Sequence, residues 1–469
     1  MDYLGCDAYE KSINSAGSGV AFMAKFGDED FIVAKNISDF KGEAIGDGKI
    51  KAPLTHENAS VLRKLFTHTA PSRVLRKDRS FGVGDRLGIA AYGHIRLFDK
   101  YDAYPVFAQQ SIRELMLTNR TYEDVLDAVT FAVFREGFKK EWGADGDHLK
   151  TAKDVEYALS LGYTMITLDC SEHIKPAPST RAASLPSSYT AKYMGKKFDI
   201  GEGINLSFTE AELGDCIAIY GEAIDFAADM YKQFLGNGKY SADFEISIDE
   251  TDAPTTPLQH YFVAGELIDA GVSFATMAPR FCGEFQKGID YKGDLAQFEK
   301  EIKIHAVIAR HFKYKLSIHS GSDKFSTFPS IGKETRGIFH VKTAGTNWLE
   351  AMRTVAAVDP TLYREIHEYA LSSAFEEARK YYHVTTDLNK IPDIKTLKDT
   401  DLPDLFNNND SRQLIHITYG LILSKKNPDG SFTFKDRLYK LWKTHSDLYT
   451  QALVKHIGKH LDLLGVKKI

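Results

Sequence analysis

Two histidines and several acids stand at the ends of short apolar runs in the middle of this 469-residue chain. His148 follows Asp147 at the end of one run, His319 ends a second, and Asp249 and Glu250 end a third. Neutral imidazole and carboxylate oxygen suit a divalent ion such as zinc, manganese, nickel or cobalt. Because these residues form no local spacing motif, they predict a metal site only if the fold brings the run ends together.

A closed (β/α)8 barrel of the α/β class would do this, since the carboxyl ends of parallel barrel strands meet at one face. From about residue 82 to 345 the sequence alternates short apolar runs with longer stretches of helical periodicity, the pattern of parallel strands joined by helices. Eight runs favour a barrel over an open doubly wound sheet. The runs are 80–87, 104–110, 142–148, 163–170, 242–250, 272–280, 314–319 and 337–343.

Alternation within each run predicts which side chains face the barrel interior. In the run 242–250 the apolar residues take the outward phase, which leaves the polar residues inside and Glu250 at the rim. The predicted inward set is Glu245, Ser247, Asp249, His319, His340 and Lys342. Glu245 and His340 are therefore alternatives to Glu250 as a metal ligand.

An anionic substrate would need positive charge at the same rim. Arg280, Lys342 and Arg113 are the candidates, and Arg280 is favoured because a planar guanidinium grips a carboxylate with two hydrogen bonds. The turn 319–323 resembles the small-residue turn after the seventh strand that binds phosphate in many barrels. Its backbone N–H groups, together with Ser322, could hold an anion.

The composition argues against several classes of partner. A net charge of -5 and a pI near 6.4 provide no basic field for nucleic acid or an anionic membrane. No signal-like start and no run of 18 apolar residues occur, so we expect a cytoplasmic protein. The four cysteines, Cys6, Cys170, Cys216 and Cys282, lack CxxC spacing and are expected to be reduced, mostly buried thiols. The oligomeric state stays open.

The chain divides into three predicted parts. Residues 1–75 are of mixed character and are expected to form an appendage that covers one end of the barrel. Residues 76–345 form the barrel, with a long insertion at 174–208 that would lie over the active face as a lid. Residues 346–469 are expected to form a helical extension.

Several short sequence motifs follow one another along the chain. They are SFGVGDRLG (80–88), AQQSIREL (108–115), GADGDHLKT (143–151), TLD (167–169) with Glu172 and His173, and SRQ (411–413). From about residue 75 onward the chain thereby resembles the tagaturonate epimerase family. The resemblance implies an isomerase that interconverts tagaturonate and fructuronate with a divalent metal during hexuronate breakdown.

The implied reaction inverts C3 of a sugar acid whose ketone is at C5, numbered from the carboxylate. The C3 hydrogen is not acidified by that ketone, so we expect retro-aldol cleavage of the C3–C4 bond to an enediolate, followed by re-addition. The pair Asp147 and His148 looks like the Asp–His pair of class II aldolases. The resemblance then implies His148, Glu250 and His319 as metal ligands, Asp147 and Asp249 as proton carriers, and Gln109, Ser111, Arg280, Lys342 and Ser322 as substrate contacts.

Other interpretations stay open. A class II type aldolase would release the two fragments, and the neutral ketoses tagatose and fructose could serve as substrates. A non-catalytic barrel that binds sugar acids would show no turnover, although many strand-end acids and histidines would be costly in a pure binder. Residues 82–88 read GxGxxxG, one residue away from the dinucleotide fingerprint, which makes nicotinamide chemistry a minor alternative.

Overall fold

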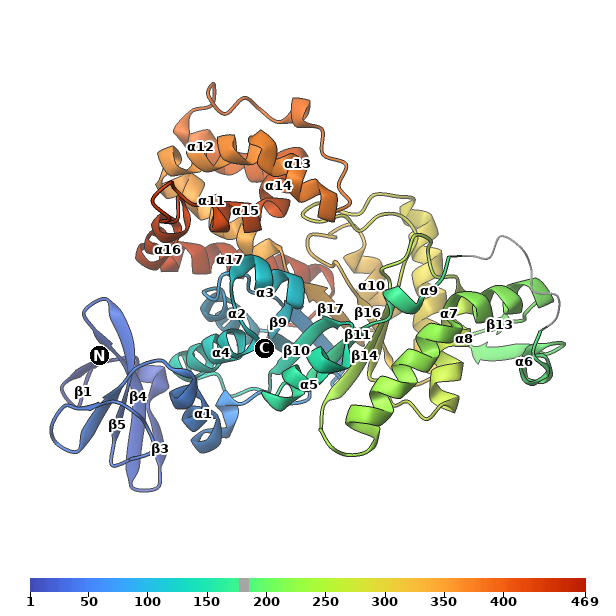
Figure 1. The fold of residues 1–469 in the computed structure, drawn as a ribbon, viewed down its shortest axis with the longest axis horizontal. Coiled ribbons are helices and arrows are strands. Elements are labelled where there is room, and N and C mark those ends of the chain that lie inside the picture. The colour runs from blue at the N-terminus through green and yellow to red at the C-terminus, as the bar shows by residue number, and fades with distance from the viewer. Residues whose placement is uncertain (177–184) are drawn as a thin grey trace.

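Eight parallel strands close into a barrel at the centre of the molecule (Figure 1). The computed structural model describes residues 1–176 and 185–469. Each predicted run overlaps one strand, so the (β/α)8 prediction is confirmed. In chain order the strands are β8 (Arg79–Val83), β9 (Tyr104–Ser111), β10 (Gly143–Leu149), β11 (Met165–Asp169), β14 (Asp243–Ile248), β15 (Thr276–Pro279), β16 (Lys315–Ile318) and β17 (Phe339–Thr343).

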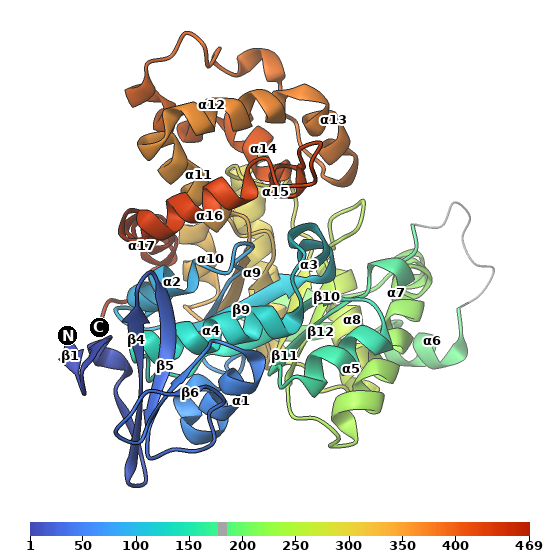
Figure 2. The ribbon, with the colours of Figure 1, turned by 60° about the vertical axis from the view of Figure 1, so that its left-hand side comes forward.

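Helices cover the outside of the barrel, and the eighth helix comes from a distant part of the chain. The strand β17 is not followed by a helix in the eighth position. Instead α17 (Ser446–Leu463) packs between α2 and α10, where Leu453 lies against Gly93 (Figure 2). Its Ile457 and Leu461 belong to the barrel's own apolar core. The other covering helices are α2 (Ala91–Phe98), α4 (Tyr122–Glu136), α5 (Ala152–Ser160), α7 (Glu210–Tyr231), α8 (Pro257–Asp269), α9 (Leu295–His311) and α10 (Phe328–Glu334).

The N-terminal region is an antiparallel sheet with one helix, and it packs on the side of the barrel. Its strands are β1 (Asp2–Tyr3), β2 (Cys6–Ala8), β3 (Asn14–Ala16), β4 (Gly19–Phe26), β5 (Glu29–Lys35), β6 (Glu43–Ala44) and β7 (Lys49–Ala52), followed by α1 (His56–Leu65). Phe131 and Phe134 of α4 join its apolar core. Arg63 also pairs with Asp127 of α4 at 2.7 Å.

The segment that follows this sheet closes the amino end of the barrel. The N–H of Leu75 donates to Asp243 Oδ2 at 2.9 Å, and Lys315 Nζ donates to the carbonyl of Lys77 at 2.6 Å. Val74 and Leu75 pack against residues of the barrel strands. Residues 1–75 were expected to cover one end of the barrel, but in the described structure their sheet buries its apolar face on α4, and Val74 and Leu75 make the contacts with the amino end.

The described part of the insertion after β11 lies on the outer helices. It forms α6 (Ser187–Tyr193), β12 (Phe198–Gly201) and β13 (Ile204–Leu206). Tyr193 Oη donates to Glu266 of α8 at 2.5 Å, and Arg310 of α9 pairs with Glu202 at 2.8 Å. Both contacts lie near the carboxyl ends of those helices, and therefore at the end of the barrel opposite to the carboxyl ends of the strands. The part of the lid prediction that falls on 177–184 lies outside the described residues.

The C-terminal extension contributes a second helical body. Its helices are α11 (Thr346–Val358), α12 (Pro360–Tyr369), α13 (Phe375–Ala378), α14 (Asn409–Ile417), α15 (Tyr419–Ser424) and α16 (Lys435–Thr444). They enclose a separate apolar core that contains Trp348 and Trp442. Figure 1 shows this body above α3 (Ile112–Thr118), and Gly420 of α15 lies against Leu117. It therefore stands over the carboxyl ends of the barrel strands.

Two further features of the chain are the state of its cysteines and the apolar character of its helices. All four cysteines are buried free thiols, as expected from their spacing. Among the described residues, none of the helices has both the length and the apolar character needed to span a bilayer.

Candidate active site

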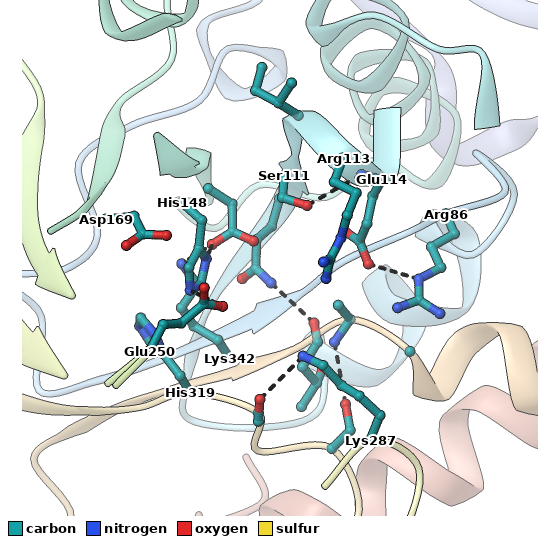
Figure 3. Close-up of a pocket in the computed structure, with 18 of the residues that line it drawn as sticks. Arg86, Ser111, Arg113, Glu114, His148, Asp169, Glu250, Lys287, His319 and Lys342 are labelled. Atoms are coloured by element: carbon teal, nitrogen blue, oxygen red, sulfur yellow. Dashed lines mark hydrogen bonds and ion pairs between the residues drawn. The ribbon is translucent and has the colours of Figure 1, made fainter. Parts of the chain in front are cut away.

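A cavity of about 410 Å³ opens at the carboxyl ends of the barrel strands. Figure 3 shows His148, His319 and Glu250 on one side of it, with Lys342 beside them, and it shows Arg113, Arg86 and Lys287 on the facing side. The structure brings together almost all of the residues that the sequence singled out. The predicted residues that line the cavity are Gln109, Ser111, Asp147, His148, Asp249, Glu250, His319, Ser322 and Lys342.

Three of these residues form a group with the composition of a metal site. Ligand atoms of His148, Asp249 and His319 all lie within 4.8 Å of one another. Glu250, predicted as the third ligand, lies farther out, with Oε1 4.0 Å from His148 Nε2 and 54% of its side chain exposed. Two imidazoles and one carboxylate fit a divalent ion of the zinc or manganese type, and Glu250 is close enough to add a further oxygen.

An irregularity in β10 lets two consecutive side chains face the cavity. Neighbouring residues of a regular strand point to opposite faces, so Asp147 and His148 could not both point inward. The pairing of β10 with β11 shifts register between Gly146 and Leu149, and His148 has a φ of 54°. A bulge of this kind redirects a side chain at the rim of a barrel. The left-handed conformation at His148 therefore turns its ring into the site.

Each histidine is oriented by an acid. His148 Nδ1 donates to Asp147 Oδ1 at 2.7 Å, and His319 Nε2 donates to Glu245 Oε1 at 2.8 Å. The other nitrogen of His319 lies 3.0 Å from Asp249 Oδ1. A carboxylate on one ring nitrogen fixes the ring and leaves the other nitrogen aimed at the metal position. Asp147 and Glu245 thus have the geometry of groups that position the two histidines.

Lys342 contacts the acids of both acid–histidine pairs and balances their buried negative charge. Its Nζ contacts Asp145 Oδ2 at 2.7 Å, Thr167 Oγ1 at 2.7 Å, Glu245 Oε1 at 3.4 Å, and also Asp147. An ammonium has only three N–H donors, so these contacts already use them. Lys342 lines the cavity, but its charge is directed at the acids that hold the histidines.

Burial and these charges set the protonation of the site. Burial lowers the pKa of Lys342, but its three acids outweigh burial and raise that pKa well above its usual range. Burial would raise the pKa of Asp147, yet Lys342 and His148 hold it well below normal. In Asp145 burial prevails over Lys342 and raises the pKa to about 6. Burial opposes protonation of His319, but Asp249 and Glu245 raise its pKa to about 10.

His340 lies deeper in the barrel, outside this group. Its Nδ1 lies 2.9 Å from Ser80 Oγ, and burial lowers the pKa of the ring to about 3. It is therefore neutral at pH 7. The geometry therefore favours Asp249, and neither His340 nor Glu245, as the third metal ligand beside His148 and His319.

Other predicted residues take up positions along the remaining wall. Gln109 Nε2 donates to the carbonyl of Thr343 at 3.1 Å, and among the described residues its buried Oε1 has no hydrogen-bond partner. Ser111 caps α3 by accepting from the N–H of Glu114 at 3.3 Å, and Ser322 Oγ accepts from the N–H of Ala344 at 3.3 Å. All three place polar atoms where a hydroxylated substrate could bind.

Two predicted anion contacts are arranged differently from the expectation. Arg280 lines an adjoining cavity of about 320 Å³ that shares Asp249, Glu250 and His319 with the first. In the turn after β16 the N–H of Gly321 donates to the carbonyl of Lys342 and that of Asp323 donates to a histidine of α17. These two N–H groups are therefore already used and do not face an anion.

Several lining residues were not found from the sequence. Lys287 and Gln286 come from the loop between β15 and α9, while Tyr382 and His416 come from the C-terminal body. None of them follows a strand directly, so the rule of strand ends did not select them. The string SRQ (411–413) was a usable signal, because Gln413 Nε2 donates to Gln286 Oε1 at 2.9 Å.

Comparisons with known proteins point in one direction. Residues 9–464 match the tagaturonate epimerase family. A tagaturonate/fructuronate epimerase of Thermotoga maritima is 43% identical over 478 residues, which covers 98% of this chain and 97% of that relative. The native crystal structure of a fructuronate-tagaturonate epimerase from Cohnella laeviribosi matches with a TM-score of 0.95 at 48% identity, covering 98% of this chain and 97% of that one. A glycerol complex of that enzyme matches with a TM-score of 0.95 at 47% identity, covering 99% and 97%.

Proposed function

This chain belongs to the tagaturonate epimerase family, and from that membership we propose that its barrel pocket interconverts D-tagaturonate and D-fructuronate with the help of a divalent metal ion. The proposal of a metal rests on one observation, the group formed by His148, Asp249 and His319 at the barrel mouth. The family and the relatives support an epimerase, and the ligand group supports its metal dependence.

The position of the inverted carbon restricts the chemistry. With the ketone at C5, removal of the C3 hydrogen would give an anion that the ketone cannot stabilise. Cleavage of the C3–C4 bond avoids this, because the electron pair of that bond passes to C4 and becomes an enediolate conjugated with C5. C3 becomes an aldehyde, and re-formation of the bond on its other face inverts the centre. No oxidant or reductant is required.

The proposed route needs proton transfers, for which the site offers carboxylates on the cavity wall. The C3 hydroxyl proton must leave as the bond breaks, and we propose Asp147, a carboxylate on the cavity wall, as the group that accepts it. Lys342 contacts Asp147, and its positive charge offsets the change in the charge of Asp147 during proton transfer. Asp249, the second predicted proton carrier, accepts from Ser247 Oγ at 2.7 Å and lies within the ligand group, so we propose it as a metal ligand instead.

His148, His319 and Asp249 would hold the metal, and Glu250 would add an oxygen ligand from the rim. A divalent ion at that position would supply fixed positive charge for the oxygens that become negative during cleavage. The acids behind the histidines would keep both rings in their ligating orientation without movement.

Two related activities compete with this proposal. An aldolase would use the same cleavage and let the fragments leave, and a neutral ketose such as tagatose or fructose would present the same reacting carbons without the carboxylate. We propose the uronate because Lys287 and Arg113 face the cavity without an acidic partner among the described residues, and a neutral ketose would bring no negative charge to balance them.

The test is to follow tagaturonate by NMR in D₂O with metal-supplemented protein and a chelated control. We expect fructuronate to appear, chelator to abolish the conversion, and no deuterium to enter at C3. Deuterium at C3 would contradict the cleavage route, conversion that survives chelation would contradict the metal, and accumulation of free three-carbon products would favour the aldolase. No conversion at all would refute the proposed function.

A further inference from the structure

Lys287 is a cation of the pocket for which the described residues provide no acidic partner. It lines the cavity, and its Nζ donates to Ser320 Oγ at 3.2 Å. Within the described parts of the chain it forms no ion pair, whereas Lys342 contacts three acids and Arg86 pairs with Glu114 at 2.8 Å. An ammonium that faces a cavity without a counter-charge favours an anion there.

The loop that carries Lys287 is fixed from the side away from the cavity. Lys324 Nζ donates to the carbonyl of Gln286 at 2.8 Å, and Gln413 Nε2 donates to the carbonyl of Lys287 at 3.2 Å. Arg412 Nε donates to the next carbonyl at 2.7 Å. Three consecutive carbonyls are thus held by the barrel and by α14. The side chain of Lys287 is presented to the cavity by a backbone with little freedom to move.

A second cation approaches from the facing wall. Figure 3 shows Arg113 and Lys287 on opposite sides of the pocket, with His148 and Glu250 to one side of both. The guanidinium of Arg113 lies 4.8 Å from the centre of the Tyr382 ring, and the described residues give it no acidic partner. On the side of the pocket away from the metal group, two cations therefore face each other without an acidic partner among the described residues.

Resting on the proposed function, we infer that Lys287, with Ser320 beside it and Arg113 opposite, binds the carboxylate of the substrate. Ser320 directly follows His319, so this contact lies one residue from the metal group. A hexuronate bound with its carboxylate on Lys287 would direct the remainder of its carbon chain toward His148, His319 and Asp249.

This contact would also decide what happens after cleavage. Breaking the C3–C4 bond leaves a three-carbon fragment that carries the carboxylate at C1 and the new aldehyde at C3. If the carboxylate is held, the fragment stays in the pocket while rotation about the C2–C3 bond presents the other aldehyde face. The C3–C4 bond then forms again and Asp147 returns the proton to the C3 oxygen. Lys287 would thus retain the fragment and make the enzyme an epimerase instead of an aldolase.

The experiment compares Lys287→Met with wild type, with Lys287→Arg as the conservative variant and Lys300→Met, an exposed lysine of α9, as the matched control. Loss of one charge-assisted hydrogen bond should lower kcat/KM for tagaturonate by about 10- to 100-fold, chiefly through KM. Free three-carbon aldehyde acid should also appear in the NMR spectrum of Lys287→Met. Lys287→Arg should recover most of the activity, and Lys300→Met should match wild type.

An unchanged KM together with no release of fragments would overturn the inference. If Lys287→Met does not fold, as judged by thermal unfolding, Ser320→Ala gives the same test, with KM expected to rise several-fold and fragments to appear. Failure of the proposed function itself would show separately, as a wild-type enzyme that does not convert tagaturonate. In that case calorimetric titration of tagaturonate into wild type and Lys287→Met still measures whether this lysine binds the anion.

Discussion

His319 is a side chain with an acid on each of its ring nitrogens, and it lies between the buried and the open parts of the site. Glu245 behind it is fully buried and is held by Thr276 Oγ1 at 2.6 Å, while Asp249 in front of it borders the cavity. Without a metal, two acids favour a protonated ring. With a metal on the Asp249 side, the proton toward Glu245 would remain and fix the tautomer. The same residue can therefore exchange a proton for an ion without moving.

Replacement of His319 by Ala should remove bound metal and activity together. The change leaves one imidazole and one acid of the group, too few for a closed divalent site. Metal content per chain and turnover of tagaturonate are the measurements, with turnover expected to fall at least about 100-fold, the order expected when a metal ligand is lost. His311→Ala, at an exposed position at the end of α9, should keep both. A His319→Ala enzyme with stoichiometric metal and full activity would rule out the ligand role.

His367 predicts a measurable dependence of stability on pH. It is buried in the C-terminal body, burial lowers its pKa to about 4, and its Nε2 has no partner among the described residues. The unfolded chain binds a proton below about pH 6.5, whereas the folded protein does not until about pH 4. Stability is therefore lost as pH falls through this window, by about 1.4 kcal/mol per pH unit.

His367→Met should flatten this dependence. Between pH 7.5 and 5 the free energy of unfolding of wild type should fall about 2 kcal/mol more than that of the variant, measured by urea unfolding. His445→Met, which replaces an exposed histidine, should behave like wild type. Equal slopes for wild type and His367→Met would show that this ring does not control the acid sensitivity.

At the scale of elements, the alternation of inward and outward side chains along the strands predicted much of the site. A bulge in one strand and a loop between elements account for the rest. Glu245, His319 and Lys342 face the interior because they occupy the polar phase of regular strands, which a sequence displays. The inward turn of His148 depends on a bulge in β10, and a bulge leaves no mark in an alternating pattern. Lys287 escaped notice because a loop reaches the site only through contacts made far along the chain.

The close approach of β8 and β9 offers a test at this scale. A Cβ added at Gly82 would lie 1.7 Å from Gln109 Oε1, so Gly82→Ala must displace the end of that side chain from its place in the cavity wall. Because the displaced atoms belong to a side chain, we expect the barrel to fold and kcat/KM to fall by about 10-fold or more, the usual result of misplaced contacts.

Gly221→Ala is the matched control on α7. Among the described residues, nothing beyond its own stretch of helix lies within 4 Å of the added Cβ, and alanine in a helix interior should raise the free energy of unfolding by up to about 1 kcal/mol with activity unchanged. Wild-type activity in Gly82→Ala would show that Gln109 does not need its present position.

On the scale of the whole molecule, α17 joins the two bodies. Its apolar face completes the barrel core through Ile457 and Leu461, and Leu453 and Tyr449 belong to the core of the helical body. His456 pairs with Glu350 of α11 at 3.3 Å. The sequence predicted a helical extension here, but its role as the eighth barrel helix could not be seen, because local patterns do not report which distant surfaces meet.

A pair of substitutions on α17 tests this role. Leu461 is fully buried, and Leu461→Ala should lower the free energy of unfolding by about 2–5 kcal/mol and destabilise the barrel and the helical body in one transition. Leu448, 41% exposed on the same helix, should cost no more than about 0.5 kcal/mol when changed to Ala. The stability of both variants is measured by circular dichroism and tryptophan fluorescence during thermal unfolding. Two separate transitions in Leu461→Ala would show that the bodies unfold independently.

The late position of α17 in the chain also affects how the protein is made. About a hundred residues separate the end of β17 from the start of this helix, so at roughly 5–20 residues per second the ribosome needs roughly 5–20 s to reach it. During that interval all eight strands exist, but the apolar surfaces of α2 and α10 have no partner. A nascent chain at this stage would display a hydrophobic seam, which is the kind of surface that chaperones bind during synthesis.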